Sequence, residues 1–106
     1  MTTVYLTAPG DVADTLASGL VEGRFAACVN QIPCRSTYRW EGDVTTDDEC
    51  VLIAKTTSER YDALVEYVSD AHPHDVPCIE RFEETDGFDP YETWVRETVT
   101  GETDTD

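Results

Sequence analysis

The chain has 106 residues, with 23 Asp and Glu against 7 Lys and Arg, so its formal net charge is −16. This charge argues against a nucleic-acid partner and against anionic membrane surfaces, because both need a basic protein surface. Apolar residues make up 40% of the chain, enough for one folded domain, but their runs are too short to span a membrane. No secretory signal is visible, so we expect a single domain over residues 1–106 in the cytoplasm.

The acidic residues are dispersed over the whole chain, and Lys55 is its only lysine. A functional acidic patch would be clustered. A dispersed acidic coat is typical of adaptation to high salt, because the Debye length falls to about 3 Å at 1 M and self-repulsion is screened. We therefore interpret the charge as that of a halophilic protein.

The first elements are a short strand at 4–7 and a helix that follows it. We expect Asp11 to cap the helix, with Asp14 as a capping-box partner, and Gly23 to end it. The apolar residues of this segment recur at helical spacing: Ala13, Leu16, Ala17, Leu20 and Val21.

A long hairpin follows this helix. Its first strand, 26–32, is interrupted by Pro33, which favours an edge position or a bulge, and resumes at 36–40. A turn is expected at 42–43. The returning strand, 49–56, is apolar enough to predict burial on both of its faces.

Thr57 or Ser58 begins a second helix, which Pro73 ends, and 76–82 reads as a fourth strand. A last helix begins at Asp89. Its signals are Asp89 as the N-cap, Pro90 at the first helical position and Glu92 at the third. The polar residues 100–106 are expected to fray.

This order of elements predicts an α+β, ferredoxin-like fold: a split β-α-β with an antiparallel sheet, both main helices on one face, a long hairpin and an added C-terminal helix. The other face of the sheet would then be left with little cover. We therefore expect the chain to form a homo-oligomer.

Residues that could hold a metal gather where the second helix ends. His72, His74 and Cys78 lie close in sequence, and imidazole with thiolate suits copper or zinc. An alternative is that His72 caps the helix C-terminus and that Cys78 is a small buried residue. A closed zinc site also needs four ligands, which are not evident here.

Three other side chains stand out. Tyr38 and Trp40 on the hairpin are typical of an interface or a core, since aromatic residues dominate both. Lys55 indicates either a site that needs a compact ammonium or an ion pair with a neighbouring acid. The chain carries no Walker loop, dinucleotide fingerprint, nucleophile elbow or zinc-protease motif, so nothing predicts an enzyme.

Several segments resemble, in order and spacing, the CutA family of divalent-cation tolerance proteins. They are Thr7-Ala8-Pro9, Ala26 to Asn30, Ser36 to Gly42, Lys55-Thr56, His72 to Pro77, and Tyr91 with Trp94. The resemblance covers about 4–99. It implies a ferredoxin-like subunit and a tight homotrimer in which long hairpins pack across subunits, similar to the nitrogen-regulatory signalling proteins. It also implies a link to copper and other divalent cations and no enzymatic activity.

The family's proposed copper ligands are carried over unevenly. Leu6 stands where bacterial members have a cysteine, and Ala71 replaces the first of two adjacent histidines. His72 remains, while His74 and Cys78 stand where the family commonly has tyrosine and glutamate.

The resemblance also implies that Tyr38, Trp40, Lys55, His72 and Trp94 line or support a cleft between subunits. We therefore expect a homotrimeric divalent-cation tolerance protein that binds copper or another divalent metal weakly. The alternative is a ligand-sensing trimer with a small anion near Lys55 and no role for metal. Its hairpin offers no glycine-rich phosphate loop, which makes this alternative the weaker one.

Overall fold

The structure is a computed structural model and describes residues 1–101, so residues 102–106 of the predicted frayed tail lie outside it. Its elements, in chain order, are β1 (Thr2–Pro9), α1 (Gly10–Glu22), β2 (Cys28–Trp40), β3 (Asp43–Thr56), α2 (Ser58–Ala71), β4 (Ile79–Glu83) and α3 (Asp89–Thr100). Among residues 1–101, no helix is long and apolar enough to cross a membrane.

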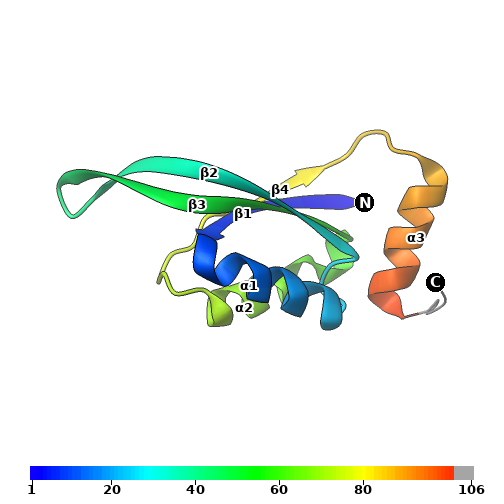
Figure 1. The fold of residues 1–106 in the computed structure, drawn as a ribbon. Coiled ribbons are helices and arrows are strands. Elements are labelled where there is room, and N and C mark those ends of the chain that lie inside the picture. Colours follow the sequence, from blue (N-terminus) through cyan, green and yellow to red (C-terminus); the bar gives the residue numbers. More distant parts are fainter. Residues whose placement is uncertain (102–106) are drawn as a thin grey trace.

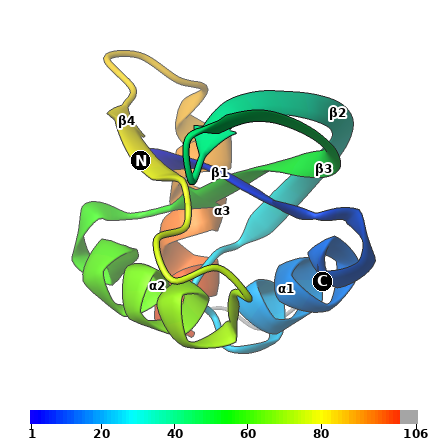
Figure 2. The ribbon, with the colours of Figure 1, turned by 90° about the vertical axis from the view of Figure 1, so that its left-hand side faces the viewer.

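The four strands form one antiparallel sheet in the order β2-β3-β1-β4. Helices α1 and α2 lie side by side under one face of this sheet, as Figures 1 and 2 show. The α+β class, the antiparallel sheet and the two helices on one face are therefore confirmed.

The face that the helices cover holds the core. Along β1 the side chains alternate strictly, and Val4, Leu6 and Ala8 are fully buried against helix residues such as Leu16 and Leu64. This alternation follows from the period of two residues in a strand, which places every second side chain on one face. Burial of each large aliphatic side chain stabilises the fold by about 1.5–3 kcal/mol.

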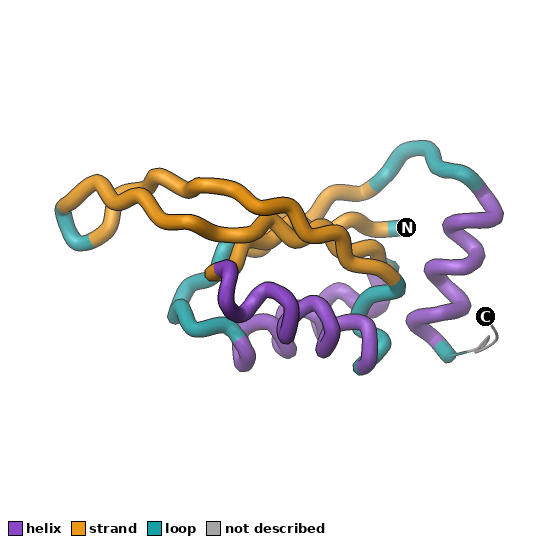
Figure 3. Tube along the Cα trace, viewed as in Figure 1, coloured by secondary structure: helices purple, strands orange, loops and turns teal. Residues whose placement is uncertain are grey.

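The hairpin of β2 and β3 projects beyond the helices as an arm, seen at the left of Figure 3, and the molecule extends 47 Å along its longest axis. Residues 41 and 42 form its turn, with positive φ angles of 50° at Glu41 and 87° at Gly42. Two positive φ angles match a type I′ turn, whose twist suits two long paired strands. The turn thus lies one residue earlier than predicted, and β3 begins at Asp43 rather than at residue 49.

Pro33 does not interrupt β2, which runs unbroken to Trp40 with Pro33 opposite Cys50. The reason lies in the sheet order, since β2 is an edge strand and tolerates a missing N–H that faces away from its neighbour. The edge position was thus predicted correctly, whereas the break in the strand was wrong.

The helix caps differ from those predicted. Pro9 is the N-cap of α1 and Phe88 that of α3, so Asp11 and Asp89 lie inside the first turns. There their carboxylates suit the positive end of the helix dipole without a capping hydrogen bond. Thr57 precedes α2 as expected, and α2 ends at Ala71, two residues before Pro73.

Helix α3 stands at the end of the sheet rather than over its second face (Figure 1). Its buried residues Val95 and Val99 pack with Ala27, Met1 and Tyr91 in a small separate core. Strand β3 is consequently not buried on both faces: Leu52 is fully buried, but its neighbour Ile53 is half-exposed. The predicted second buried face is wrong for the single chain, because none of its described elements covers that side.

Candidate functional site

Most of the side chains that could bind a ligand lie on the uncovered side of the sheet. We call this side the open face. Strand register defines it, because residues directly opposite one another in an antiparallel pair share a face. Its members are Cys28, Asn30 and Ile32 of β2, Val51, Ile53 and Lys55 of β3, Thr3, Tyr5 and Thr7 of β1, and Glu80 and Phe82 of β4.

One end of the open face, next to α3, holds Lys55. Register places Cys28, Lys55, Thr3 and Phe82 in a single row across all four strands. We call this set the Lys55 row. Lys55 is half-exposed, and no hydrogen bond or ion pair joins its side-chain ammonium to another residue within 1–101. The ion pair with a neighbouring acid, which the sequence offered as one explanation of Lys55, is therefore absent from this part of the chain.

Tyr91 of α3 closes the β2 end of the row. Desolvation raises the pKa of the Tyr91 hydroxyl, and the Cys28 thiol that is hydrogen-bonded to it raises this pKa further. The Tyr91 ring packs against that of Trp94, with 5.6 Å between the ring centroids. Trp94 remains 41% exposed, so an aromatic surface borders the row on this side.

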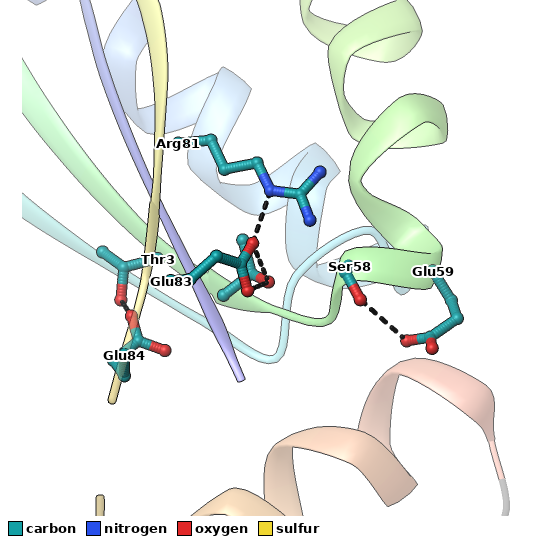
Figure 4. Close-up of polar contacts among 7 residues, drawn as sticks. Thr3, Ser58, Glu59, Arg81, Glu83 and Glu84 are labelled. Atoms are coloured by element: carbon teal, nitrogen blue, oxygen red, sulfur yellow. Dashed lines mark hydrogen bonds and ion pairs between the residues drawn. The ribbon is translucent and has the colours of Figure 1, made fainter. Parts of the chain in front are cut away.

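Glu84 lies beside the row at the β4 side. The Thr3 hydroxyl donates a hydrogen bond to its Oε2, as Figure 4 shows, while its Oε1 is buried without a hydrogen-bond partner. A buried carboxylate oxygen that lacks a donor is costly and uncommon in folded proteins.

The other end of the open face adjoins His72, which is buried with 8% of its surface exposed. Its Nε2–H donates to the carbonyl of Thr7 at 2.8 Å, and its Nδ1 accepts from the backbone N–H of His74 at 3.1 Å. These partners require the neutral tautomer with the proton on Nε2. Metal binding by His72 would therefore require breaking one of two backbone hydrogen bonds.

His74 and Cys78 are more accessible. Both are exposed, and the His74 ring lies 5.0 Å from that of His72. Partial burial raises the pKa of the Cys78 thiol, a hydrogen bond with Thr7 lowers it, and the nearby charges of Glu80 and Glu49 raise it. Together these effects raise the pKa of the Cys78 thiol above its ordinary value.

The described residues do not form a closed metal site. Within 1–101, no three His, Cys, Asp or Glu side chains lie close enough together to hold a metal ion. The chemistry of His74 and Cys78 suits copper or zinc, but two ligands are too few for a stable site.

The aromatic pair predicted for a cleft lies on the arm. The Tyr38 hydroxyl donates to Asp47, which raises the pKa of Tyr38, and Trp40 is 61% exposed. Both side chains belong to the end of the hairpin away from Lys55, because β3 runs from Asp43 at the tip to Thr56. One chain therefore does not bring the predicted cleft residues together.

The comparisons with known proteins now decide the family. A family model described as "CutA1 divalent ion tolerance protein" matches residues 2–98. This chain belongs to the CutA1 family. The "Divalent-cation tolerance protein CutA" of Thermus thermophilus is 44% identical over 96 residues, which cover 89% of this chain and 93% of that protein.

Solved structures of CutA proteins share the fold. The Archaeoglobus fulgidus protein, described as a "Periplasmic divalent cation tolerance protein", matches with a TM-score of 0.89 at 35% identity, over 93% of this chain and 99% of that one. A "PII-like protein CutA" from Nostoc sp. PCC 7120 matches with a TM-score of 0.90 at 26% identity, over 93% and 97%. These relatives are named for tolerance or likeness to PII, and not as enzymes.

Sequence reasoning missed Glu84, Cys28 and Tyr91 as possible site residues. Their relevance depends on strand register and on the position of α3, which brings Tyr91 to Cys28. A strict alternation count along 26–56 was the one signal that could have placed Cys28 opposite Lys55.

Proposed function

We propose that this CutA1 family member acts as a homotrimer that binds copper or another divalent cation weakly at a boundary between subunits. The observation that carries this proposal is the exposure of two soft or borderline ligands, His74 and Cys78, in the segment that joins α2 to β4. A second copy would cover the apolar part of the open face and supply further ligands.

The open face supports association because it exposes apolar area that a single chain leaves in water. Ile32 is 48% and Phe82 54% exposed, and Tyr5, Val51 and Ile53 lie between them. Contiguous apolar patches of this kind mark interaction surfaces. Light scattering in molar KCl tests this part of the proposal: we expect three subunits, and a monomer would contradict it.

The predicted cleft also requires more than one copy. Tyr38 and Trp40 lie at the far end of the arm from Lys55 and Trp94. They can line one cleft only if the arm of one subunit lies against the body of another. Burial there would also shield Trp40, which one chain leaves exposed.

We assign the direct ligand role to His74 and Cys78 and a positioning role to His72. The two hydrogen bonds of His72 fix the backbone at Thr7 and His74, and Thr7 also contacts Cys78. Glu49 and Glu80 add negative charge that favours a cation. Because binding must release the thiol proton of Cys78, whose pKa is raised, affinity is expected to rise with pH through and above neutrality.

Calorimetric titration of the intact trimer with Zn(II), and with Cu(I) under anaerobic conditions, tests the metal site. We expect His74→Ala and Cys78→Ser each to lower affinity by about tenfold or more. His72→Ala is expected to keep the binding stoichiometry while lowering stability. Cys34→Ser, a half-exposed cysteine on the arm, is the matched control. Unchanged affinity in both His74→Ala and Cys78→Ser would place any metal elsewhere.

A further inference from the structure

The segment that joins β4 to α3, residues 84–88, contains the one Asp-Gly pair of the sequence, Asp86-Gly87. In Figures 1 and 2 this segment arches away from the sheet and from the two main helices. Asp86 is exposed and belongs to neither a helix nor a strand. The peptide bond between Asp86 and Gly87 therefore lies on the surface, outside the regular backbone that orders most of the chain.

Neither of the two groups that could react here is held in place. Within residues 1–101, the Asp86 carboxylate makes no hydrogen bond or ion pair, and the Gly87 N–H makes no hydrogen bond. A backbone N–H that is bonded into a helix or sheet could not turn toward a side chain without losing that bond. Gly87 also has no Cβ that would shield its nitrogen. The Gly87 nitrogen is thus free to approach Cγ of Asp86.

We propose that Asp86-Gly87 is a site of spontaneous backbone isomerisation, at which Asp86 is converted to isoaspartate in the folded protein. The Gly87 nitrogen attacks Cγ of the protonated Asp86 carboxyl and forms a C–N bond. The nitrogen's proton and the carboxyl hydroxyl leave as water, and a cyclic succinimide remains. A water molecule then adds to the main-chain carbonyl carbon and breaks its bond to the nitrogen, so the chain runs on through Cβ and Cγ. One water is released and one is taken up, with no other reactant.

A second exposed aspartate shows what distinguishes Asp86. Asp75 is also exposed and also lies outside the helices and strands, in residues 72–78. It precedes Val76, whose branched side chain crowds the nitrogen that would have to attack. The other aspartates of residues 1–101 belong to helices or strands, where the backbone is held by regular hydrogen bonds. Asp86 therefore combines exposure, an irregular backbone and a following glycine, which no other described aspartate does.

The isomerisation acts on the position of α3, because the segment is fixed on both sides of the reacting pair. On the β4 side, the Thr3 hydroxyl donates a hydrogen bond to Glu84. On the α3 side, a side chain at position 87 would collide with the Glu92 carboxylate, so the Gly87 backbone packs closely against α3. Isoaspartate inserts one more carbon, about 1.5 Å of main chain, between these two contacts. The segment or α3, which carries Trp94, has to shift to accommodate it.

Peptide mapping of the aged protein tests the site. The parent protein is kept for several weeks in molar KCl at neutral pH, with light scattering to report its assembly. Mass spectrometry that distinguishes isoaspartate from aspartate, together with methyl transfer by an isoaspartyl methyltransferase, counts the product. We expect isoaspartate at Asp86 to form at least about tenfold faster than at Asp75. The rate at Asp86 should also come within about tenfold of the rate in the urea-unfolded chain, because the folded chain does not hold the pair.

Three variants assign the reaction to this pair. Asp86→Glu keeps the charge but requires a larger ring, and it is expected to remove the signal. Asp75→Glu makes the same change in the other exposed segment and is expected to leave the signal unchanged. Val76→Gly creates a second exposed Asp-Gly pair, and it should raise isoaspartate formation at Asp75 at least about tenfold. Gly87→Ala is unsuitable as a control, since its side chain would meet Glu92.

Fluorescence measures the effect on α3. The chain has two tryptophans, so Trp40→Phe leaves Trp94 as the only one. In this variant, the chromatographically separated isoaspartyl form should show a red-shifted Trp94 emission and a lower melting temperature than the aspartyl form. Identical emission and melting temperatures in the two forms would contradict the effect on α3.

Three further outcomes would overturn the proposal. The first is isoaspartate formation that is no faster at Asp86 than at Asp75. The second is a signal that survives Asp86→Glu, since it would then come from another residue. The third is a rate at Asp86 more than about tenfold below that of the unfolded chain, which would show that the fold or another copy of the chain protects the pair.

Discussion

The two faces of the sheet are built from the same strands but differ in how far their side chains are buried. On the covered face, Val4, Leu6, Leu52 and Ala54 are fully buried under α1 and α2. On the open face, the residues between them remain half-exposed, and Lys55 has no ion pair within the described chain. The covered face is completed by the chain itself, whereas the open face needs another molecule.

This difference separates stability from function along a single strand. Because successive side chains of β3 point to opposite faces, a substitution at one position tests folding and a substitution at the next tests association.

Leu52→Ala removes a fully buried side chain from the covered face. We expect the free energy of unfolding to fall by about 2–5 kcal/mol, since the transfer free energy is lost and a cavity remains. Urea denaturation in molar KCl measures it. Ile53→Ala, one residue further along β3, should cost clearly less when the chains are separated. Equal losses would show that the two faces are equally buried within one chain.

Ile53→Asp places a carboxylate in the middle of the open face. We expect the proposed trimer to dissociate, because an unpaired charge is costly to bury between subunits. Light scattering reports the assembly, and circular dichroism should show that the separated chain keeps its secondary structure. A variant that still forms three subunits would mean that association uses another surface.

Low ionic strength should act on the assembly more than on the covered core. The proposed trimer brings together three chains that each carry a formal charge of −16, and dilute buffer removes the screening between them. We expect a lower melting temperature or dissociation after dialysis from molar KCl into dilute buffer. Unchanged stability would indicate that neighbouring groups compensate the acids locally, and the halophilic interpretation would then be wrong.

His72→Ala tests a buried polar contact between the end of α2 and β1. The substitution leaves the Thr7 carbonyl and the His74 N–H without their partner, so we expect a loss of about 1–3 kcal/mol in unfolding free energy. His74→Ala removes an exposed ring and should change stability little, which makes it the control. If the two variants unfold alike, the His72 hydrogen bonds do not stabilise the fold.

Much of this fold could be predicted from local sequence patterns. Alternation and helical spacing identified the four strands and three helices, and Pro33 indicated an edge strand. The hairpin was predicted too short, because polar residues such as Thr46 and Asp47 do not look like a strand until β2 pairs with them. The caps were misplaced by one or two residues, since Asp11 and Asp89 also suit a first helical turn.

The candidate site was harder to predict for a physical reason. His72 was singled out as a ligand from its type and spacing, but its hydrogen bond to Thr7 joins residues 65 positions apart. Glu84 and Thr3 are 81 positions apart and meet only through the pairing of β1 with β4. Sequence spacing shows which residue types lie near one another along the chain. Strand register is needed to show which of their atoms already have a hydrogen-bond partner.

The smallest effect is expected at the sheet edge, where β4 divides its side chains between the two faces. Arg81 stacks over Tyr61 of α2 at 4.8 Å and donates to Glu83, while Phe82 between them belongs to the open face. The Arg81 hydrogen bond is the main cause that lowers the pKa of the Glu83 carboxyl below its ordinary value, and the Thr2 hydroxyl adds to it. A lowered pKa stabilises the fold above the ordinary carboxyl pKa, and this contribution is lost as the pH falls through the folded-state value.

We expect Arg81→Gln to raise the pKa of Glu83 toward the ordinary value, with only a slight loss of stability at neutral pH that vanishes in acid, because the pair is exposed to solvent. An NMR titration of the Glu83 carboxyl carbon measures this shift, and Arg39→Gln on the arm should leave it unchanged. If Glu83 titrates identically in the parent and in Arg81→Gln, the Arg81 hydrogen bond is not what lowers the pKa of this carboxyl.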